Sequence, residues 1–272
     1  ECASVAPAGA RLWFQVYAWR DRDLIRTMVE RAAAANFEAL CLTVDTAVLG
    51  RRERDVRRGL TLPPEIGPGT FIDGLRHPGW TWRFLRSDPI RFANVEGSDR
   101  VRGDPGDGST AVDLSAYMGS QFDHALSWKD VEWLRSVWEG PVLVKGIQTV
   151  ADAVLAVEHG VDAVILSNHG GRQLDGAPAP FDLVPEVVDA VGGRTEVICD
   201  GGVRRGSDIV KAVAAGATAT MGGRLFLYAL AAAGEEGVDH VLELLRSGTE
   251  RTMALVGASS VDELGAELLE WS

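Results

Sequence analysis

The sequence is poor in cysteine and has no long apolar run. Three of its 272 residues are cysteine (Cys2, Cys41 and Cys199), and their spacing matches neither a metal site nor a disulfide framework. We therefore expect structural thiols in a reducing compartment. A run of about 18 apolar residues, which a transmembrane helix needs, does not occur, and neither does the basic-then-apolar pattern of a secretory signal. These absences predict a cytoplasmic protein.

Positive charge is also scarce. Lys and Arg number 27 against 39 Asp and Glu, a formal net charge of −12. We expect no nucleic-acid partner, because phosphate binding needs a basic face. No Gly-x-Gly-x-x-Gly turn follows a first strand, which argues against a dinucleotide-binding Rossmann domain. His and carboxylate residues form no cluster with metal-ligand spacing, so we predict no metal.

Apolar runs alternate with amphipathic segments along most of the chain. Strands are predicted at residues 12–17, 39–44, 142–144, 163–166, 196–199 and 217–221, and helices after Asp21 or Asp23 and at 128–138, 150–159, 183–191, 207–214, 225–232, 238–245 and 251–255. Such alternation demands a parallel sheet with right-handed crossovers. The fold class is α/β, and the length fits one domain, residues 1–272, of the TIM (β/α)8 barrel type. About six of the eight strand–helix units are present.

A long segment, about 56–127, interrupts this alternation and is predicted to be an insertion or loop. Within it, residues 71–93 combine aromatic side chains with four Arg against two Asp. We favour packing of these residues over the active site or a neighbouring subunit. The alternative is peripheral contact with anionic lipid on the inner face of the membrane.

The strongest site signal is residues 167–176, Ser-Asn-His-Gly-Gly-Arg-Gln-Leu-Asp-Gly, directly after the apolar run 161–166. A glycine-rich polar turn after a buried strand is typical of a functional site. His169 can act as a base near neutral pH, and Arg172 can bind a carboxylate with its planar fork of donors. The pair indicates proton chemistry on a small acid, although His169 alone could be a hydrogen-bonded turn residue.

Four other motifs occur in a fixed order around this turn: residues 43–46 (Thr-Val-Asp-Thr), 49–53 (Leu-Gly-Arg-Arg-Glu), 144–146 (Val-Lys-Gly) and 200–208 (Asp-Gly-Gly-Val-Arg-Arg-Gly-Ser-Asp). With them, nearly the whole chain resembles the FMN-dependent L-2-hydroxy-acid dehydrogenases and oxidases, the family of flavin-type lactate dehydrogenase, mandelate dehydrogenase and glycolate oxidase. The resemblance implies that the family's cap and first two barrel strands precede Glu1, so that residues 1–272 would be an N-terminally incomplete FMN-binding domain.

The resemblance also implies roles for individual residues. His169 would be the base and Asp45 its partner, while Arg172 binds the substrate carboxylate, Tyr17 hydrogen-bonds the substrate and Arg52 adds positive charge. Three of these residues have a simpler alternative: Asp45 could cap a helix, Tyr17 could belong to the core, and Arg52 could be solvated together with Arg51.

The predicted cofactor residues lie in glycine turns and at strand ends. Glycine turns after consecutive late strands are where such barrels bind a phosphate at helix N-termini, and Lys145 at a strand end would stabilise the reduced anionic flavin. The resemblance adds three polar residues, Gln15, Thr43 and Ser167. The predicted FMN set is Gln15, Thr43, Lys145, Ser167, Asp200, Gly201, Gly202, Arg204, Gly223 and Arg224.

The predicted function is FMN-dependent oxidation of an L-2-hydroxy acid to the 2-oxo acid, with lactate as the first substrate candidate and mandelate next. The electron acceptor is left open between oxygen, a quinone and a cytochrome, and the resemblance implies a homotetramer. The alternative is a catalytically inactive partial barrel that acts as a binding module.

Overall fold

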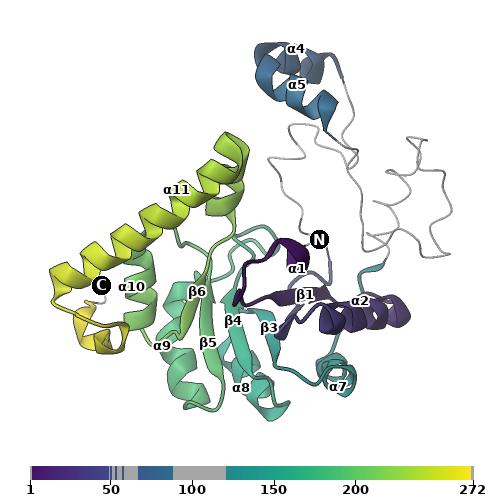
Figure 1. The fold of residues 1–272 in the computed structure, drawn as a ribbon. Coiled ribbons are helices and arrows are strands. Elements are labelled where there is room, and N and C mark those ends of the chain that lie inside the picture. The colour runs from purple at the N-terminus through teal and green to yellow at the C-terminus, as the bar shows by residue number, and fades with distance from the viewer. Residues whose placement is uncertain are drawn as a thin grey trace.

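The chain forms six parallel strands in one sheet. The computed structural model describes residues 2–48, 50, 53, 57, 67–87 and 121–270. The strands are β1 (Trp13–Tyr17), β2 (Ala39–Thr43), β3 (Val142–Ile147), β4 (Ala163–Ser167), β5 (Glu196–Asp200) and β6 (Ala219–Met221) (Figure 1). Each pairs with the next in chain order, so the sheet is a curled half-barrel, and the predicted α/β class is confirmed.

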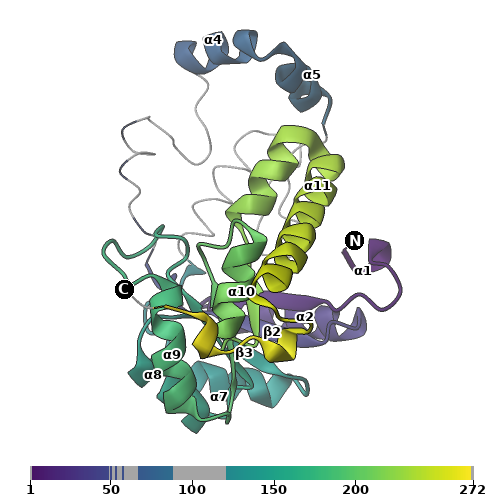
Figure 2. The ribbon, with the colours of Figure 1, turned by 90° about the vertical axis from the view of Figure 1, so that its left-hand side faces the viewer.

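Helices connect the strands and cover the outer face of the sheet (Figures 1 and 2). The described helices, in chain order, are α1 (Cys2–Val5), α2 (Arg22–Ala34), α4 (Pro68–Arg76), α5 (Pro78–Arg86), α7 (Trp128–Val137), α8 (Val150–Glu158), α9 (Pro180–Val191), α10 (Gly206–Ala214) and α11 (Arg224–Val256), with short 3-10 turns at Val261–Glu263 and Ala266–Leu268. Of these, α4 and α5 stand apart from the sheet and do not cover it. None of these helices is both long enough and apolar enough to cross a bilayer.

Helix α2 shows how the local sequence specifies an element. Asp21 is its N-cap, and the Asp21 carboxylate accepts a hydrogen bond from the Leu24 backbone N–H at 3.0 Å. The side chains predicted for its apolar stripe are the buried ones: Leu24, Ile25, Met28, Val29 and Ala32. This spacing places them on one face, which packs against the sheet.

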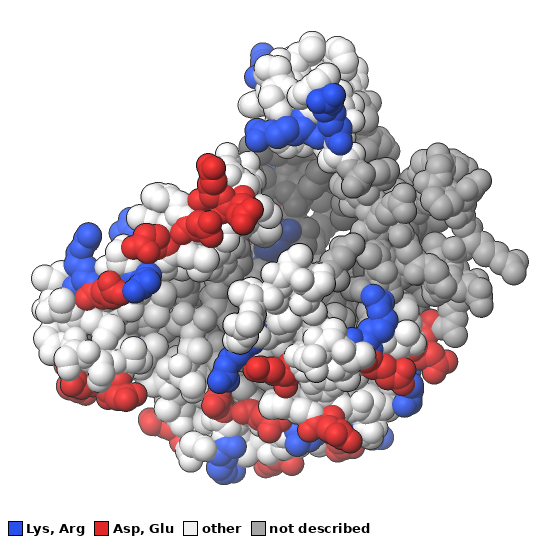
Figure 3. Space-filling model, viewed as in Figure 1, with Lys and Arg blue, Asp and Glu red and all other residues white. Residues whose placement is uncertain are grey.

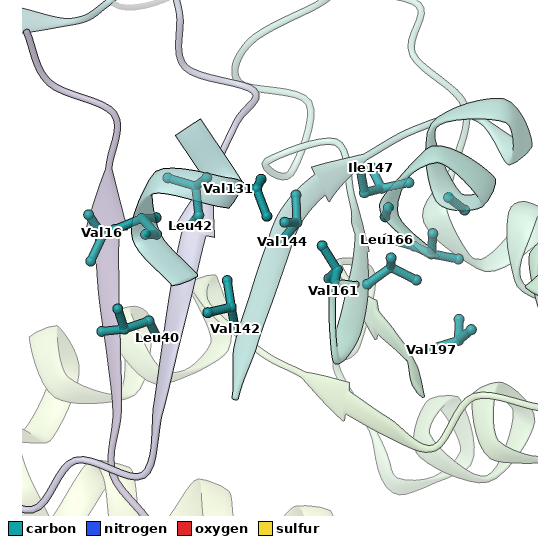
Figure 4. Close-up of a cluster of buried hydrophobic side chains, with 14 of the residues drawn as sticks. Val16, Leu40, Leu42, Val131, Val142, Val144, Ile147, Val161, Leu166 and Val197 are labelled. Atoms are coloured by element: carbon teal, nitrogen blue, oxygen red, sulfur yellow. The ribbon is translucent and has the colours of Figure 1, made fainter. Parts of the chain in front are cut away.

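The strands alternate between two apolar clusters. Leu40 and Leu42 of β2 point outward with Val142 and Val144 of β3 and meet the helices (Figure 4). Cys41 belongs to the inner cluster, together with alternate residues of the neighbouring strands: Ala39, Leu143, Ala163, Ile165 and Ile198. Because side chains alternate along a strand, the next inward positions are polar and lie at the carboxyl edge of the sheet.

Strand β3 and helix α11 differ most from the sequence prediction. Strand β3 runs to Ile147 with an irregular register between Lys145 and Ile147, so Lys145 lies within the strand and not at its end. Helix α11 has one break, at Ala233 and Gly234, where we predicted three helices. Gly248 does not end a helix, because it lies where α11 crosses α10.

The reason is close packing between α10 and α11. A Cβ built on Gly206 would lie 2.0 Å from the Thr249 backbone nitrogen, and one built on Gly248 would lie 3.2 Å from the Gly206 nitrogen. Glycine at both positions lets the two backbones meet. Helix α9 also begins earlier than predicted, because Pro180 suits the first turn of a helix.

Candidate active site

The structure brings His169 and Asp45 together from distant parts of the sequence. The His169 Nδ1 lies 3.1 Å from Asp45 Oδ1. The Asp45 side chain is 3% exposed and that of His169 is 25% exposed, so the carboxylate is buried while the imidazole reaches the surface. A carboxylate only accepts hydrogen bonds, so Nδ1 carries the proton of a neutral ring and Nε2 is left with its lone pair. This is the tautomer of a base.

The backbone conformation of the turn that carries His169 requires the two glycines that follow it. His169 has a φ of +54°, and Gly170 and Gly171 continue in the left-handed region at +68° and +70°. The His169 backbone N–H donates to Ser167 Oγ at 3.1 Å. A Cβ on Gly170 would also collide with the guanidinium of Arg224. The turn is therefore held at the His169 N–H by the Ser167 hydroxyl and at Gly170 by the Arg224 guanidinium.

A charged network lies beside this pair inside the sheet. Lys145 Nζ is 2.6 Å from Asp200 Oδ2 and donates to Ser167 Oγ at 2.9 Å, and Ser167 Oγ donates to Asp200 Oδ2 at 2.7 Å. The Lys145 and Asp200 side chains are 11% and 14% exposed. Three adjacent strands thus place one ammonium group at the inner face, neutralised by one carboxylate.

Cys41 lies one inward position below this network. Burial raises the pKa of the Cys41 thiol to about 12, while Lys145 lowers it and Asp200 raises it. The thiol is therefore protonated at neutral pH and belongs to the apolar cluster beneath the polar network.

Polar residues of β1 and β2 extend the same edge. Gln15 donates through Nε2 to Thr43 Oγ1 at 2.6 Å and to the Tyr17 hydroxyl at 3.3 Å. Tyr17 packs edge to face against Phe122 with ring centroids 6.0 Å apart. Burial, then Asp45, then Cys41 raise the Tyr17 pKa above its ordinary 10.0. The Tyr17 hydroxyl therefore remains a hydrogen-bond donor at neutral pH.

Two glycine turns follow β5 and β6. Gly201 and Gly202 have φ angles of +119° and +75°. A Cβ added to Gly202 or Gly223 would meet no atom of the described residues within 4 Å, apart from the chain neighbours of each glycine. Arg204 is exposed. Its backbone N–H and that of Arg205 donate to Asp208 Oδ2, each at 2.9 Å, so these two amides are already used. The space for an anion lies at the glycines.

Arg224 lies closer to His169 than the sequence indicated. It begins α11, and its Nη2 donates to the Gly170 carbonyl oxygen. The structure thus brings the predicted phosphate side and the base turn into contact. Arg172 has an exposed side chain three residues beyond His169. Arg52 lies outside the described residues.

Sequence reasoning missed two residues that shape the site. Gly146 has a φ of +107°, and a Cβ there would lie 2.8 Å from the Asp45 Cβ, so only glycine lets the Asp45 side chain occupy its position. Gln173 bonds to the segment that carries Asp45. A glycine directly after Lys145 and a glutamine directly after Arg172 were the available signals.

Known proteins resemble this chain over nearly its whole length. The model of the family described as FMN-dependent dehydrogenase matches residues 1–271. A candidate L-lactate dehydrogenase of Mycobacterium tuberculosis is 44% identical over 260 residues, which cover 96% of this chain and 60% of that protein. An L-lactate oxidase of Nostoc is 44% identical over 259 residues, covering 94% of this chain and 63% of that protein.

The fold is also shared with solved structures. The crystal structure of the monotopic membrane protein (S)-mandelate dehydrogenase superposes with a TM-score of 0.88 at 38% identity, over 98% of this chain and 68% of that one. The chain thus spans about two thirds of the length of the proteins it matches, and as little as 60%. On the match over residues 1–271, the chain belongs to the FMN-dependent dehydrogenase family.

Proposed function

We propose that this chain carries the site of an FMN-dependent enzyme that oxidises an L-2-hydroxy acid to the 2-oxo acid, with lactate as the first candidate and mandelate next. The observation that carries the proposal is the His169–Asp45 pair. His169 lies in the same turn as Arg172, and its backbone N–H donates to Ser167 of the buried Lys145 network. A base, a carboxylate-binding cation and a buried positive charge are what this oxidation needs.

The described residues fit FMN. Lys145 provides an ammonium group that Asp200 and Ser167 hold in place, where it would stabilise an electron-rich reduced flavin ring. Gln15 and Thr43 offer amide and hydroxyl groups at the same edge. The open positions at Gly202 and Gly223 leave room for a phosphate, and Arg204 and Arg224 supply cationic donors. Bound there, FMN supplies the acceptor for the two electrons.

The residues of this chain would then divide the remaining work. Arg172 binds the substrate carboxylate, and the protonated Tyr17 hydroxyl donates a hydrogen bond to the substrate. The substrate loses two protons and two electrons in total; His169 Nε2 takes one proton, and the electron pair and the other proton pass to FMN when it is bound. Asp45, 3.1 Å from Nδ1, stabilises the imidazolium that results. Arg52 is proposed to add positive charge over the substrate.

The first test is a visible spectrum of the holoprotein under anaerobic conditions, before and after L-lactate and then L-mandelate. We expect a flavin spectrum that one of the two acids bleaches. A protein that binds FMN and is bleached by neither acid would overturn the substrate class. A protein that takes up no FMN would favour a catalytically inactive binding module.

The electron acceptor can be assigned in the same experiment. The relatives include proteins named as a dehydrogenase and as an oxidase, so family membership is compatible with both. Re-oxidation of the bleached protein by oxygen, by a soluble quinone or by cytochrome c, compared at equal concentration, identifies the acceptor by its rate.

We also propose that the α4–α5 hairpin rests on an anionic membrane surface. Its large apolar side chains are between 48% and 71% exposed: Phe71, Ile72, Leu75, Trp80, Trp82, Phe84 and Leu85. The hairpin stands apart from the sheet in Figures 1 and 2, and basic side chains flank uncharged surface on it in Figure 3. Arg86 lies over the Trp82 ring at 4.6 Å. Exposed aromatics with neighbouring arginines suit the headgroup region.

Vesicle sedimentation tests this location. We expect binding to vesicles that contain phosphatidylglycerol, weaker binding to neutral vesicles, and loss of binding in Trp80→Ser/Trp82→Ser. Leu227→Ser/Tyr228→Ser is the matched control, because these α11 side chains are at least as exposed, at 63% and 71%, but lie outside the hairpin. Equal loss in both variants would contradict a role specific to the hairpin. The predicted homotetramer is checked by light scattering on the same preparations.

A further inference from the structure

We propose that Gln173 is a positioning residue that fixes Asp45 relative to His169 and Arg172. The inference rests on the proposed function, because it concerns the geometry of the same site. The Gln173 Nε2 donates to the Asp45 carbonyl oxygen at 2.9 Å and to the Val48 carbonyl oxygen at 3.3 Å. The Gln173 Oε1 accepts from the Gly50 backbone N–H at 3.1 Å. One amide side chain therefore binds three points of the segment after β2.

These bonds connect two segments that are distant in sequence. Residues 45–50 carry Asp45, and residues 167–176 carry His169 and Arg172. Among the described residues, the other hydrogen bond between the two segments is the His169–Asp45 contact itself. The position of Asp45 relative to His169 thus depends largely on the hydrogen bonds that Gln173 makes to residues 45–50.

The backbone at Gly50 makes the connection close. A Cβ on Gly50 would lie 2.3 Å from the Arg172 carbonyl oxygen and 2.6 Å from the Gln173 Cα. These distances are far below van der Waals contact, so only glycine permits this approach. The backbone contact and the amide bonds act at the same place, directly beside Arg172. The residue that would bind the substrate carboxylate and the partner of the base are thereby held in one unit.

The chemistry requires an amide at position 173. Two backbone carbonyl oxygens need a donor, and one backbone N–H needs an acceptor. Glutamate keeps the acceptor but places an anion against two carbonyl oxygens, and methionine keeps the length but offers neither group. Within the described part of the chain, the Gln173 side chain bonds to residues 45–50 and not to the Lys145 network, so cofactor binding should not depend on it.

The test compares Gln173→Met with wild-type holoprotein, with Leu174→Ala as control. Leu174 is the next residue and is 65% exposed. We expect Gln173→Met to bind FMN normally and to lower kcat roughly 10- to 100-fold, since a misplacement of about 1 Å costs on that order. Leu174→Ala should keep wild-type turnover. Gly50→Ala disrupts the same contact from the other segment and should reproduce the loss if Gln173→Met fails to fold.

Two readouts separate positioning from general stability. Nitrogen NMR of isotope-labelled histidine should show that His169 loses the hydrogen-bonded Nδ1 proton signal in Gln173→Met. If Gln173 acts through Asp45, Gln173→Met should lower kcat little further in an Asp45→Asn background. An unchanged Nδ1 signal, or full multiplication of the two losses, would overturn the inference. The NMR result does not need turnover, so it is distinguishable from failure of the proposed reaction.

Discussion

Replacing Lys145 by methionine tests the buried charge network of the site. The substitution keeps the length of the side chain and removes the ammonium. The Asp200 side chain, which is 14% exposed, then keeps the Ser167 hydroxyl as its remaining hydrogen-bond partner among the described residues. At 2.6 Å and an effective dielectric constant of about 20, the attraction between the two charges is about 6 kcal/mol. Desolvation of both groups offsets part of that value.

We expect Lys145→Met to lower the free energy of unfolding by about 3–5 kcal/mol, the usual cost of leaving one buried charge unpaired. For a slope near 3 kcal/mol per molar, this shifts the urea midpoint by between about 1 and 2 M. Lys145→Met/Asp200→Asn removes both charges and should be less destabilised than Lys145→Met alone. The unfolding signal comes from tryptophan fluorescence, since the chain has eight tryptophans.

The control is the Arg135–Asp162 pair, which is similarly close at 2.9 Å but has side chains 40% and 44% exposed. Arg135→Met should cost at most about 1 kcal/mol, because solvent screens the pair. If Lys145→Met costs no more than Arg135→Met, or if Lys145→Met/Asp200→Asn is the least stable of the three, then the buried network does not have the energetics argued for it.

Four further measurements test other parts of the structure. In Gly146→Ala, the φ of +107° and the 2.8 Å approach to the Asp45 Cβ predict a loss of roughly 1–3 kcal/mol and of turnover, whereas Gly193→Ala (φ +71°, open space) should lose stability alone; equal activity in both would contradict the steric argument. Native protein should show one thiol reactive with Ellman's reagent at pH 8, that of Cys2, and three after unfolding, because burial raises the pKa values of Cys41 and Cys199 to about 12 and about 11. Unfolded thiols have a pKa near 9.0, so the stability that these two thiols contribute is complete below that pH and is lost as the pH rises toward their pKa values in the folded protein. Urea titrations at pH 8 and 10 check this loss. Asp21→Ala should cost about 1 kcal/mol in thermal or urea unfolding while Asp21→Asn costs little, because asparagine keeps an acceptor for the Leu24 N–H.

The strands and most helices were predictable from the spacing of apolar residues and from composition. Apolar runs such as residues 39–42 and 163–166 have no polar member, as expected of strands buried on both faces, and the structure confirms both strands within one residue of their predicted ends. The stripe of α2 was predictable for the same reason, because each member has the helical spacing that burial needs. In these elements local preference and tertiary packing agree.

The misassigned parts are those where packing overrides local signals. Glycine is common at helix ends, yet Gly248 lies inside α11, because Gly206 of α10 packs closely against it. Lys145 and Gly146 look like a strand end, yet pairing with β4 extends β3 to Ile147. A glycine inside an element can indicate either a terminus or a close approach, and a single sequence does not distinguish them.

The site shows the same division between local and long-range information. Each polar residue at a strand end was visible in the sequence, and parallel pairing places such ends at one edge, so proximity of Thr43, Lys145, Ser167 and Asp200 followed from the fold class. The partner of each group did not follow, because partners are set by inward alternation in strands far apart along the chain. Lys145 and Asp200 both bond to Ser167, although the strand register pairs Lys145 with Ile165 and Ser167 with Asp200, so the long Lys145 side chain reaches along β4 to Ser167. Asp45 and His169 lie beyond the strands, where alternation no longer applies, so their contact depends on the turn glycines and on Gln173. Prediction of such a contact therefore needs the turn geometry, and that geometry is specified by residues that themselves have no chemical role.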